Sequence, residues 1–96
     1  MATFITLVNF TDQGIKNVKE SPARLEAFKA MLEALGGTLK SAFYTQGDYD
    51  MVVIVEADEA VVMTGNLTAG SLGNVRTQTL RGFSEDEMKG FISNMP

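Results

Sequence analysis

The chain has 96 residues, of which 45% are hydrophobic and 21% charged, values that are ordinary for one globular domain spanning residues 1–96. The net charge is −4 and the eight basic residues are scattered, so neither nucleic acid nor a membrane surface is an expected partner. The sequence has no cysteine and no histidine, which excludes disulfides, thiolate catalysis and the usual ligands of zinc, copper and haem iron. Because only oxygen ligands remain, we expect no bound transition metal and no cofactor.

The start of the chain lacks a basic segment followed by a long apolar stretch, which is the pattern of a secretory signal. No apolar run approaches the ~20 residues that a membrane crossing needs. The expected location is therefore the cytoplasm, and the expected protein has no membrane partner.

The first half of the chain predicts a strand, a helix and a second strand. Residues 3–10 are rich in β-branched and aromatic side chains, and apolar residues occur on both faces of this strand. Ser21 and Pro22 favour a helix start, because serine suits the N-cap and proline suits the first turn. The helix that follows has one apolar stripe, made of Leu25, Phe28, Leu32 and Leu35. Residues 38–45 then predict a strand with Leu39 and Phe43 on the same face.

The second half predicts a third strand, a helix, a fourth strand and a final helix. Residues 49–56 are again apolar on both faces and form a hairpin with the preceding strand. Asp58 is expected to cap a helix over residues 58–72, although its two internal glycines each destabilise it by about 1 kcal/mol relative to alanine. Residues 75–83 predict the fourth strand. Residues 84–87 form a capping box that begins a short helix.

This order of elements predicts an α+β protein with a ferredoxin-like βαββαβ fold and an additional C-terminal helix. The four strands form one antiparallel sheet, and the first and third strands are expected at its centre because they are apolar on both faces. The two main helices can cover only one face of such a sheet. We expect the other face to be covered by a second copy of the chain, in a homodimer or larger assembly. The alternative is that the C-terminal helix folds across it.

Three motifs resemble those of one known family. Gly47-Asp48-Tyr49-Asp50 followed by residues 51–57, which are apolar except for Glu56, is similar to the signature of the GYD domain family, and residues 71–83 and 5–14 are similar to two further blocks of it. The resemblance implies a small bacterial protein of unassigned function in the dimeric α/β-barrel superfamily, with two ferredoxin-like sheets packed face to face. Residues 63–70 depart from the family, because they are more polar than its Ala- and Leu-rich second helix.

The first candidate site lies at the start of the third strand. Asp50 is a candidate general base or ligand acceptor, and Tyr49 is a candidate catalytic neighbour. A carboxylate works as a base near neutral pH only where burial raises its pKa. The alternative is structural, with a hairpin turn at Gly47 and a tyrosine that packs on the sheet.

The second group of candidates consists of polar side chains inside otherwise apolar strands. They are Asn9, Tyr44, Arg76, Thr77 and Thr79. Each could line a ligand cavity, and each could equally face solvent or bond to the backbone. An arginine in a strand, Arg76 or Arg81, can bind a carboxylate with two hydrogen bonds, or can pair with one of the acidic residues of the chain.

Two functions fit the sequence. The first is a homo-oligomeric binding module that holds a small apolar ligand between sheet and helices without chemistry. The alternative is a cofactor-independent enzyme of the monooxygenase or isomerase kind that the superfamily contains, using Asp50 or Tyr49. The lack of histidine favours the module.

Overall fold

The computed structural model describes residues 1–96 and contains one four-stranded antiparallel sheet. The strands are β1 (Ala2–Phe10), β2 (Thr38–Tyr44), β3 (Met51–Ala57) and β4 (Val75–Gly82), in the order β2-β3-β1-β4. The predicted central position of the first and third strands is therefore confirmed. The helices are α1 (Asp12–Lys16), α2 (Ser21–Ala34), α3 (Glu59–Ser71) and α4 (Glu85–Ser93), with a 3₁₀ turn at Val18–Glu20. This is the predicted α+β, ferredoxin-like arrangement with an additional C-terminal helix.

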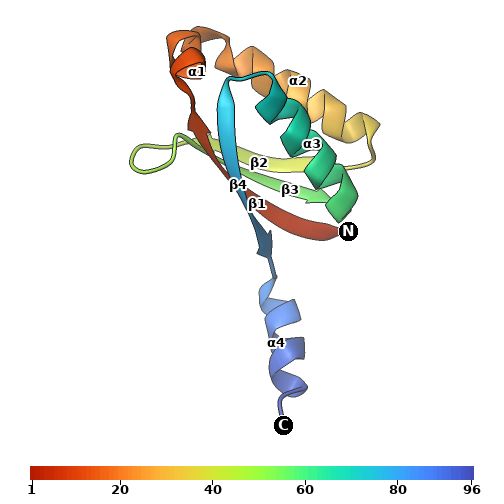
Figure 1. The fold of residues 1–96 in the computed structure, drawn as a ribbon. Coiled ribbons are helices and arrows are strands. Elements are labelled where there is room, and N and C mark those ends of the chain that lie inside the picture. Colours follow the sequence, from red (N-terminus) through yellow and green to blue (C-terminus); the bar gives the residue numbers. More distant parts are fainter.

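The two faces of the sheet have different surroundings. Helices α2 and α3 lie side by side over one face, which we call the helix face (Figure 1). Side chains of β1 and β3 alternate between the faces, and the buried ones, such as Val8 and Val53, point toward the helices. The opposite face, here called the open face, carries six apolar side chains: Ile5, Leu7, Phe43, Val52, Ile54 and Leu80. Phe43 is 61% exposed and Leu80 is 44% exposed, because nothing in the chain covers this face.

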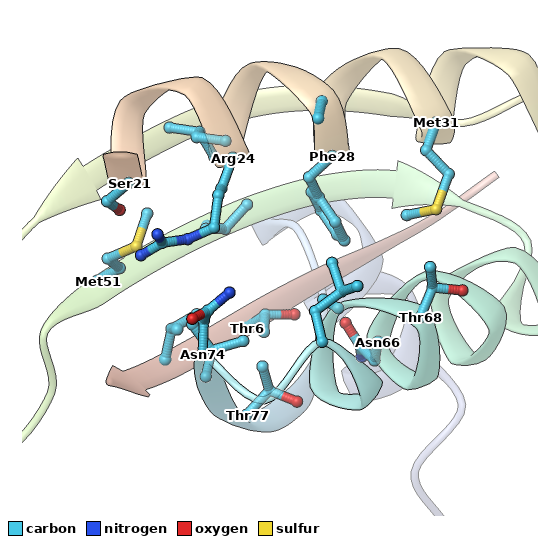
Figure 2. A pocket seen from close by; sticks show the side chains of 17 residues that line it. Thr6, Ser21, Arg24, Phe28, Met31, Met51, Asn66, Thr68, Asn74 and Thr77 are labelled. Carbon is cyan, nitrogen blue, oxygen red and sulfur yellow. The ribbon is translucent and has the colours of Figure 1, made fainter. Parts of the chain in front are cut away.

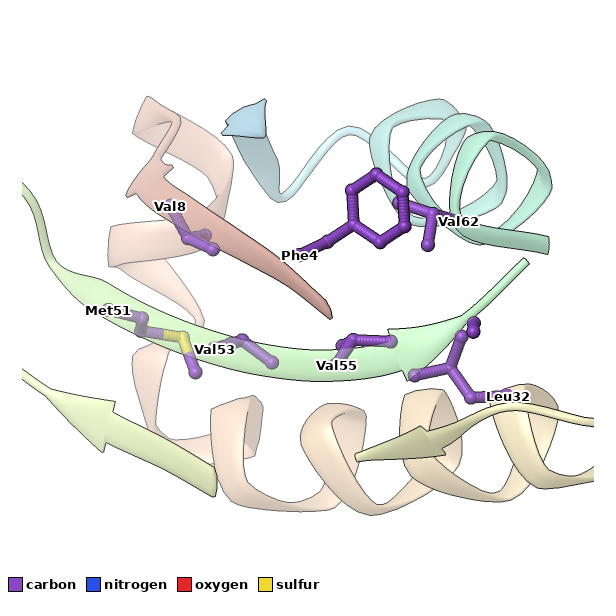
Figure 3. Packing of buried hydrophobic residues seen from close by; sticks show 8 residues of the cluster. Phe4, Val8, Leu32, Met51, Val53, Val55 and Val62 are labelled. Atoms are coloured by element: carbon purple, nitrogen blue, oxygen red, sulfur yellow. The ribbon is translucent and has the colours of Figure 1, made fainter. Parts of the chain in front are cut away.

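The layer between sheet and helices is well filled at one end. Figure 3 shows Phe4 and Val62 facing each other between β1 and α3, with Leu32 of α2 beside the end of β3 near Val55. Leu32 is 1% exposed and belongs to a cluster of eight buried hydrophobic residues. The apolar stripe of α2 therefore reaches the core as predicted through Leu25, Phe28 and Leu32, whereas Leu35 at its end is 43% exposed.

Strand β2 corrects one prediction about side-chain direction. Leu39 pairs with Val55 on the helix face, whereas Phe43 pairs with Val52 on the open face. The register shifts between Leu39 and Ser41, so that Lys40 is an extra residue in the strand. A bulge of this kind interrupts the two-residue period, and the prediction that Leu39 and Phe43 share a face was therefore wrong.

Two predicted helix caps also differ from the structure. Ser21 is the first residue of α2 rather than its N-cap, and its buried hydroxyl forms a 3.0 Å hydrogen bond with the hydroxyl of Tyr44. Asp58 does occupy the N-cap position of α3, but its side chain forms no capping hydrogen bond. The preference of serine and aspartate for helix starts therefore predicted both starts to within one residue. The hydrogen-bond partner of the Ser21 hydroxyl, by contrast, depends on how β2 packs against α2.

Helix α4 projects away from the body of the molecule (Figure 1). Its predicted capping box is confirmed: Glu87 N donates to Ser84 Oγ at 3.1 Å, and Ser84 N donates to Glu87 Oε1 at 3.1 Å. The apolar side chains of α4 are between 48% and 54% exposed, namely Met88, Phe91 and Ile92, and Met95 just after the helix is 69% exposed. The helix therefore leaves the open face uncovered, and the alternative in which it folds across that face is not what the structure shows.

The capping box makes the start of α4 sensitive to acid. The backbone N–H of Ser84, aided by the nearby Arg81 guanidinium, holds the pKa of Glu87 below its usual value. A lowered pKa in the folded state stabilises that state above the usual pKa, and this contribution is lost as the pH falls through the lowered value. We expect the NMR shifts of residues 85–93 to lose helical character below a pH of about 4.5 while the sheet persists. In Glu87→Gln, which cannot titrate, this step should disappear; an unchanged step in that variant would contradict the assignment.

Candidate ligand-binding site

A pocket of about 250 Å³ lies between the helix face of the sheet and helices α2 and α3 (Figure 2). Seventeen residues line it, ten of them hydrophobic. The apolar walls include Val8, Met51 and Val53 of the sheet, together with Leu25 and Phe28 of α2. An engineered apolar cavity of about 150 Å³ accommodates benzene, so this pocket suits a ligand of roughly ten non-hydrogen atoms.

The pocket exists because short side chains occupy one part of the layer between sheet and helices. Two of the helix-face positions of β4 are occupied by Thr77 and Thr79, opposite Val8 and Thr6 of β1, where larger apolar residues would fill the space. The two helices pack closely at Gly65, where an added Cβ would lie 3.4 Å from Leu32 Cδ2. From that point, the C-terminal half of α3 and the N-terminal half of α2 form the roof of the pocket. One end of the layer is thus packed and the other is hollow.

The floor of the pocket carries a small polar network that is internally satisfied. The hydroxyls of Thr6 and Thr79 lie 3.1 Å apart and share a hydrogen bond. Asn66 Nδ2 of α3 donates to Thr79 Oγ1 at 2.7 Å. These groups need no ligand, because each hydroxyl already has a partner.

Arg24 is the one charged residue that lines the pocket. It reaches from the first turns of α2 into the pocket, with Asn74 on the facing wall (Figure 2). Its Nη1 donates to the backbone oxygen of Asn17 at 3.1 Å and lies 4.0 Å from Glu20 Oε2. Its Nη2 is buried and has no hydrogen-bond partner, and the side chain as a whole is 23% exposed.

Asn74 belongs to the turn between α3 and β4, which α1 holds in place. Thr11 N donates to the backbone oxygen of Asn74 at 3.0 Å, and Gln13 Nε2 donates to Asn74 Oδ1 at 3.0 Å. Gly14 packs so closely on this turn that an added Cβ would lie 1.9 Å from the same backbone oxygen. Because Asn74 Oδ1 accepts this bond from Gln13, the amide nitrogen of Asn74 remains able to donate to another group.

The chain resembles known proteins over most of its length. The family model for the GYD domain matches residues 4–92. The chain belongs to the GYD domain family. A relative of this GYD domain, named "Glutamine synthetase and cystathionine beta-lyase binding protein" and found in Thermus thermophilus, is 37% identical over 82 residues, which cover 83% of this chain and 86% of the relative. No solved structure matches the chain.

The two residues predicted as catalytic lie outside the pocket of this GYD domain. The carboxylate of Asp50 accepts a hydrogen bond from the backbone N–H of Phe10 at 2.8 Å, which extends the pairing of β1 with β3. The hydroxyl of Tyr49 donates to Gln78 Oε1 at 3.0 Å. Because Gln78 pairs with Leu7 on the open face, the Tyr49 side chain lies across that face. The family's Gly-Asp-Tyr-Asp segment thus has structural contacts here, and a catalytic role for it stays a prediction.

The five predicted ligand-binding residues divide between the two faces of the sheet. Asn9 and Arg76 lie opposite each other on the open face. Thr77 and Thr79 lie on the helix face, where Thr77 lines the pocket and Thr79 forms hydrogen bonds with the pocket residues Thr6 and Asn66. The hydroxyl of Tyr44 bonds to Ser21, which is itself a pocket residue. The structure therefore does not bring these five residues into one site.

Arg81 pairs with an acidic residue of the same chain, which is the structural alternative to binding a ligand carboxylate. Its guanidinium lies 3.6 Å from Glu87 Oε2 and 4.4 Å from the ring centre of Phe83, and it donates to the backbone oxygen of Thr3 at 3.2 Å. These contacts connect the end of β4 to α4. The GYD domain has no cluster of three acidic side chains able to hold a metal ion. None of its helices has the length and apolar character that crossing a bilayer requires.

Sequence reasoning missed Arg24, although the signal was present. Arg24 precedes Phe28 by four residues and Met31 by seven, so it lies on the same side of α2 as two apolar residues that line the pocket. This spacing indicates that the Arg24 side chain is directed toward the interior. The apolar stripe of Leu25, Phe28, Leu32 and Leu35 does not include Arg24, and judged by that stripe alone the residue would face solvent.

Proposed function

We propose that this GYD domain is a homo-oligomeric binding module that holds a small, largely apolar ligand between its sheet and helices and performs no chemistry on it. The observation that carries the proposal is the composition of the pocket wall. Among its seventeen residues there is no carboxylate, no lysine and no tyrosine. Ligand pockets are mostly apolar with a few polar groups that orient the ligand, and this wall has that composition.

Catalysis in the pocket has less support. A general base must lie within hydrogen-bond distance of the proton that it removes. Asp50 and Tyr49 are not among the residues that line the pocket, and both side chains are engaged elsewhere. No other residue of the wall is a conventional base, and we therefore do not propose the monooxygenase or isomerase alternative.

Self-association through the open face is part of the proposal. Six apolar side chains lie on this face, and a soluble monomer rarely exposes a contiguous apolar patch beyond a few hundred Å². Helix α4 supports the same conclusion, because nine residues are too few for a helix to be stable without packing, and its apolar stripe is largely exposed in the single chain. A second copy offers a partner for both surfaces, since a two-fold interface buries one patch against itself.

Binding to other proteins is proposed by similarity. The Thermus thermophilus relative carries a name that describes binding to two enzymes. We propose that this GYD domain also acts by contacting other proteins, in addition to binding a ligand in its pocket and associating with itself. Its net charge of −4 favours partners with a basic surface.

Titration with a neutral apolar probe, 4-phenylbutan-1-ol, tests the pocket. We expect the amide resonances of Val8, Met51 and Val53 to shift with a Kd on the order of 0.1–1 mM, as a ligand of this size permits. Ala69→Phe should weaken binding at least ten-fold, because Ala69 lines the pocket and the added ring fills it. Ala60→Phe on the same helix, exposed and outside the pocket, is the matched control and should bind normally. Equal binding by both variants, or a wild-type protein that shows no shifts with this probe or with its carboxylate analogue, would refute the proposed pocket.

A further inference from the structure

We infer that the ligand of this pocket carries an anionic group, most simply a carboxylate, which Arg24 binds at one end while the apolar remainder fills the space below α2 and α3. This inference rests on the proposed function and specifies the class of ligand. The pocket would then select amphipathic acids, such as short aryl-alkyl or medium-chain carboxylates, over neutral molecules of the same shape.

The state of the Arg24 side chain is the first support. A guanidinium has five N–H donors and no acceptor, and burying such donors without partners is costly. Nη1 is engaged by Asn17, but Nη2 is buried and bonded to nothing. The carboxylate of Glu20 is 4.0 Å from Nη1 and its side chain is 76% exposed, so it pairs only weakly with Arg24. A ligand oxygen at Nη2 would remove this deficit.

The surroundings of Nη2 are the second support. The wall is otherwise free of charge, and a carboxylate that entered the pocket would meet no acidic residue there. In an apolar environment, a hydrogen bond between two charged groups is about twice as strong as a neutral one. Arg24 also lies in the first turns of α2, a helix of 14 residues whose dipole favours negative charge at this end.

A second free donor faces the same region. Asn74 Oδ1 accepts from Gln13, so the amide NH₂ of Asn74 is available, and Figure 2 shows this residue on the wall facing Arg24. The two donors come from different elements, α2 and the turn before β4, and both line the pocket. Two donors suit the two charged oxygens of a carboxylate, whereas an alcohol offers both donors a single neutral oxygen.

The test compares two probes that differ only at the polar end, 4-phenylbutanoate and 4-phenylbutan-1-ol, titrated by NMR into the full chain at neutral pH. We expect the carboxylate to bind wild-type protein at least ten-fold tighter than the alcohol, a difference of about 1.4 kcal/mol. In Arg24→Met, which keeps most of the side-chain length, the carboxylate should fall to the affinity of the alcohol, while the alcohol changes by less than about two-fold. Arg24→Lys should keep part of the preference, because it retains the charge without the planar pair of guanidinium donors.

Lys29→Met is the matched control, because Lys29 is an exposed cation on the same helix that does not line the pocket. It should leave both affinities unchanged, and an equal loss there would mean that the probe responds to net charge rather than to Arg24. Equal binding of the two probes to wild-type protein would overturn the inference while the proposed pocket stands, with solvent then serving as the partner of Nη2. If neither probe binds, the proposed function itself fails.

Discussion

Replacing Ile54 by glutamate is expected to prevent the proposed dimerisation and to leave a folded monomer. Ile54 lies on the open face at the centre of the sheet, opposite Ile5 of β1 and Ser41 of β2. In a single chain the new carboxylate would stay in water, so the fold should survive. In a face-to-face dimer it would be buried without a partner, at a cost of several kcal/mol. We therefore expect self-association to weaken by at least a hundred-fold, which corresponds to about 2.8 kcal/mol.

Sedimentation velocity at micromolar concentration measures this change directly, with the 10.4 kDa mass of one chain as the reference. Ile15→Glu is the matched control, because Ile15 is 53% exposed in α1 and lies outside the open face. It carries the same change of charge and should leave the dimer intact. A wild-type protein that sediments as a monomer would contradict the proposed assembly, and a dimer that persists in Ile54→Glu would place the interface elsewhere, with α4 as the remaining apolar surface.

The second large effect is expected for Gly14→Ala. The added methyl group would lie 1.9 Å from the backbone oxygen of Asn74 and 2.9 Å from its carbonyl carbon, so the backbone of one of the two segments must move. Such overpacking costs about 1–3 kcal/mol or more, which lowers Tm by roughly 4–8 °C per kcal/mol in a domain of this size. Because Asn74 lines the pocket, the same substitution should also weaken ligand binding.

Gly70→Ala provides the comparison for Gly14→Ala. Gly70 lies in α3 with no atom within 4 Å of an added Cβ, so alanine there should raise stability by about 0.5–1 kcal/mol through helix propensity alone. Thermal unfolding followed by circular dichroism should separate the two variants clearly. Equal Tm values for both would show that α1 is free to shift away from the turn at Asn74, and that it does not fix the pocket wall.

Much of the fold could be predicted from local patterns. The apolar character of both faces of residues 3–10 and 49–56 predicted that these strands lie at the centre of the sheet, and the order β2-β3-β1-β4 confirms it. The capping box at Ser84 identified the start of α4 through a short-range pairing of side chain and backbone. Both predictions rest on interactions within a few residues or on burial, which sequence patterns report well.

Other features depend on distances that no local pattern contains. The bulge at Lys40 reversed the direction of Leu39 relative to Phe43. A single extra residue cannot be recognised from the sequence of a strand seven residues long. The hollow half of the layer results from threonines in β4 combined with the position of α3 over them. Each threonine alone is compatible with a solvent-facing strand position, so the cavity became visible only when the packing of both helices was known.

The direction of α4 could not be predicted for a different reason. Its amphipathic pattern indicates that Phe91 and Ile92 need an apolar partner, but it does not say whether that partner belongs to the same chain. The Arg81–Glu87 ion pair and the contact between the rings of Phe83 and Phe91, whose centres lie 5.1 Å apart, connect α4 to the end of β4. Met88 and Ile92 stay largely exposed.

The uneven filling of the layer between sheet and helices has a consequence for how long the protein persists in a cell. A packed core is equally stable whatever small molecules surround it, whereas a hollow one gains stability by mass action when a ligand enters. At a ligand concentration of about a hundred times Kd the gain is about 2.7 kcal/mol, a substantial share of the roughly 5–15 kcal/mol that holds a typical domain folded. Chains without ligand would unfold more often and reach cellular proteases sooner. The abundance of the protein would then follow the supply of its ligand, with no change in how much of it is synthesised.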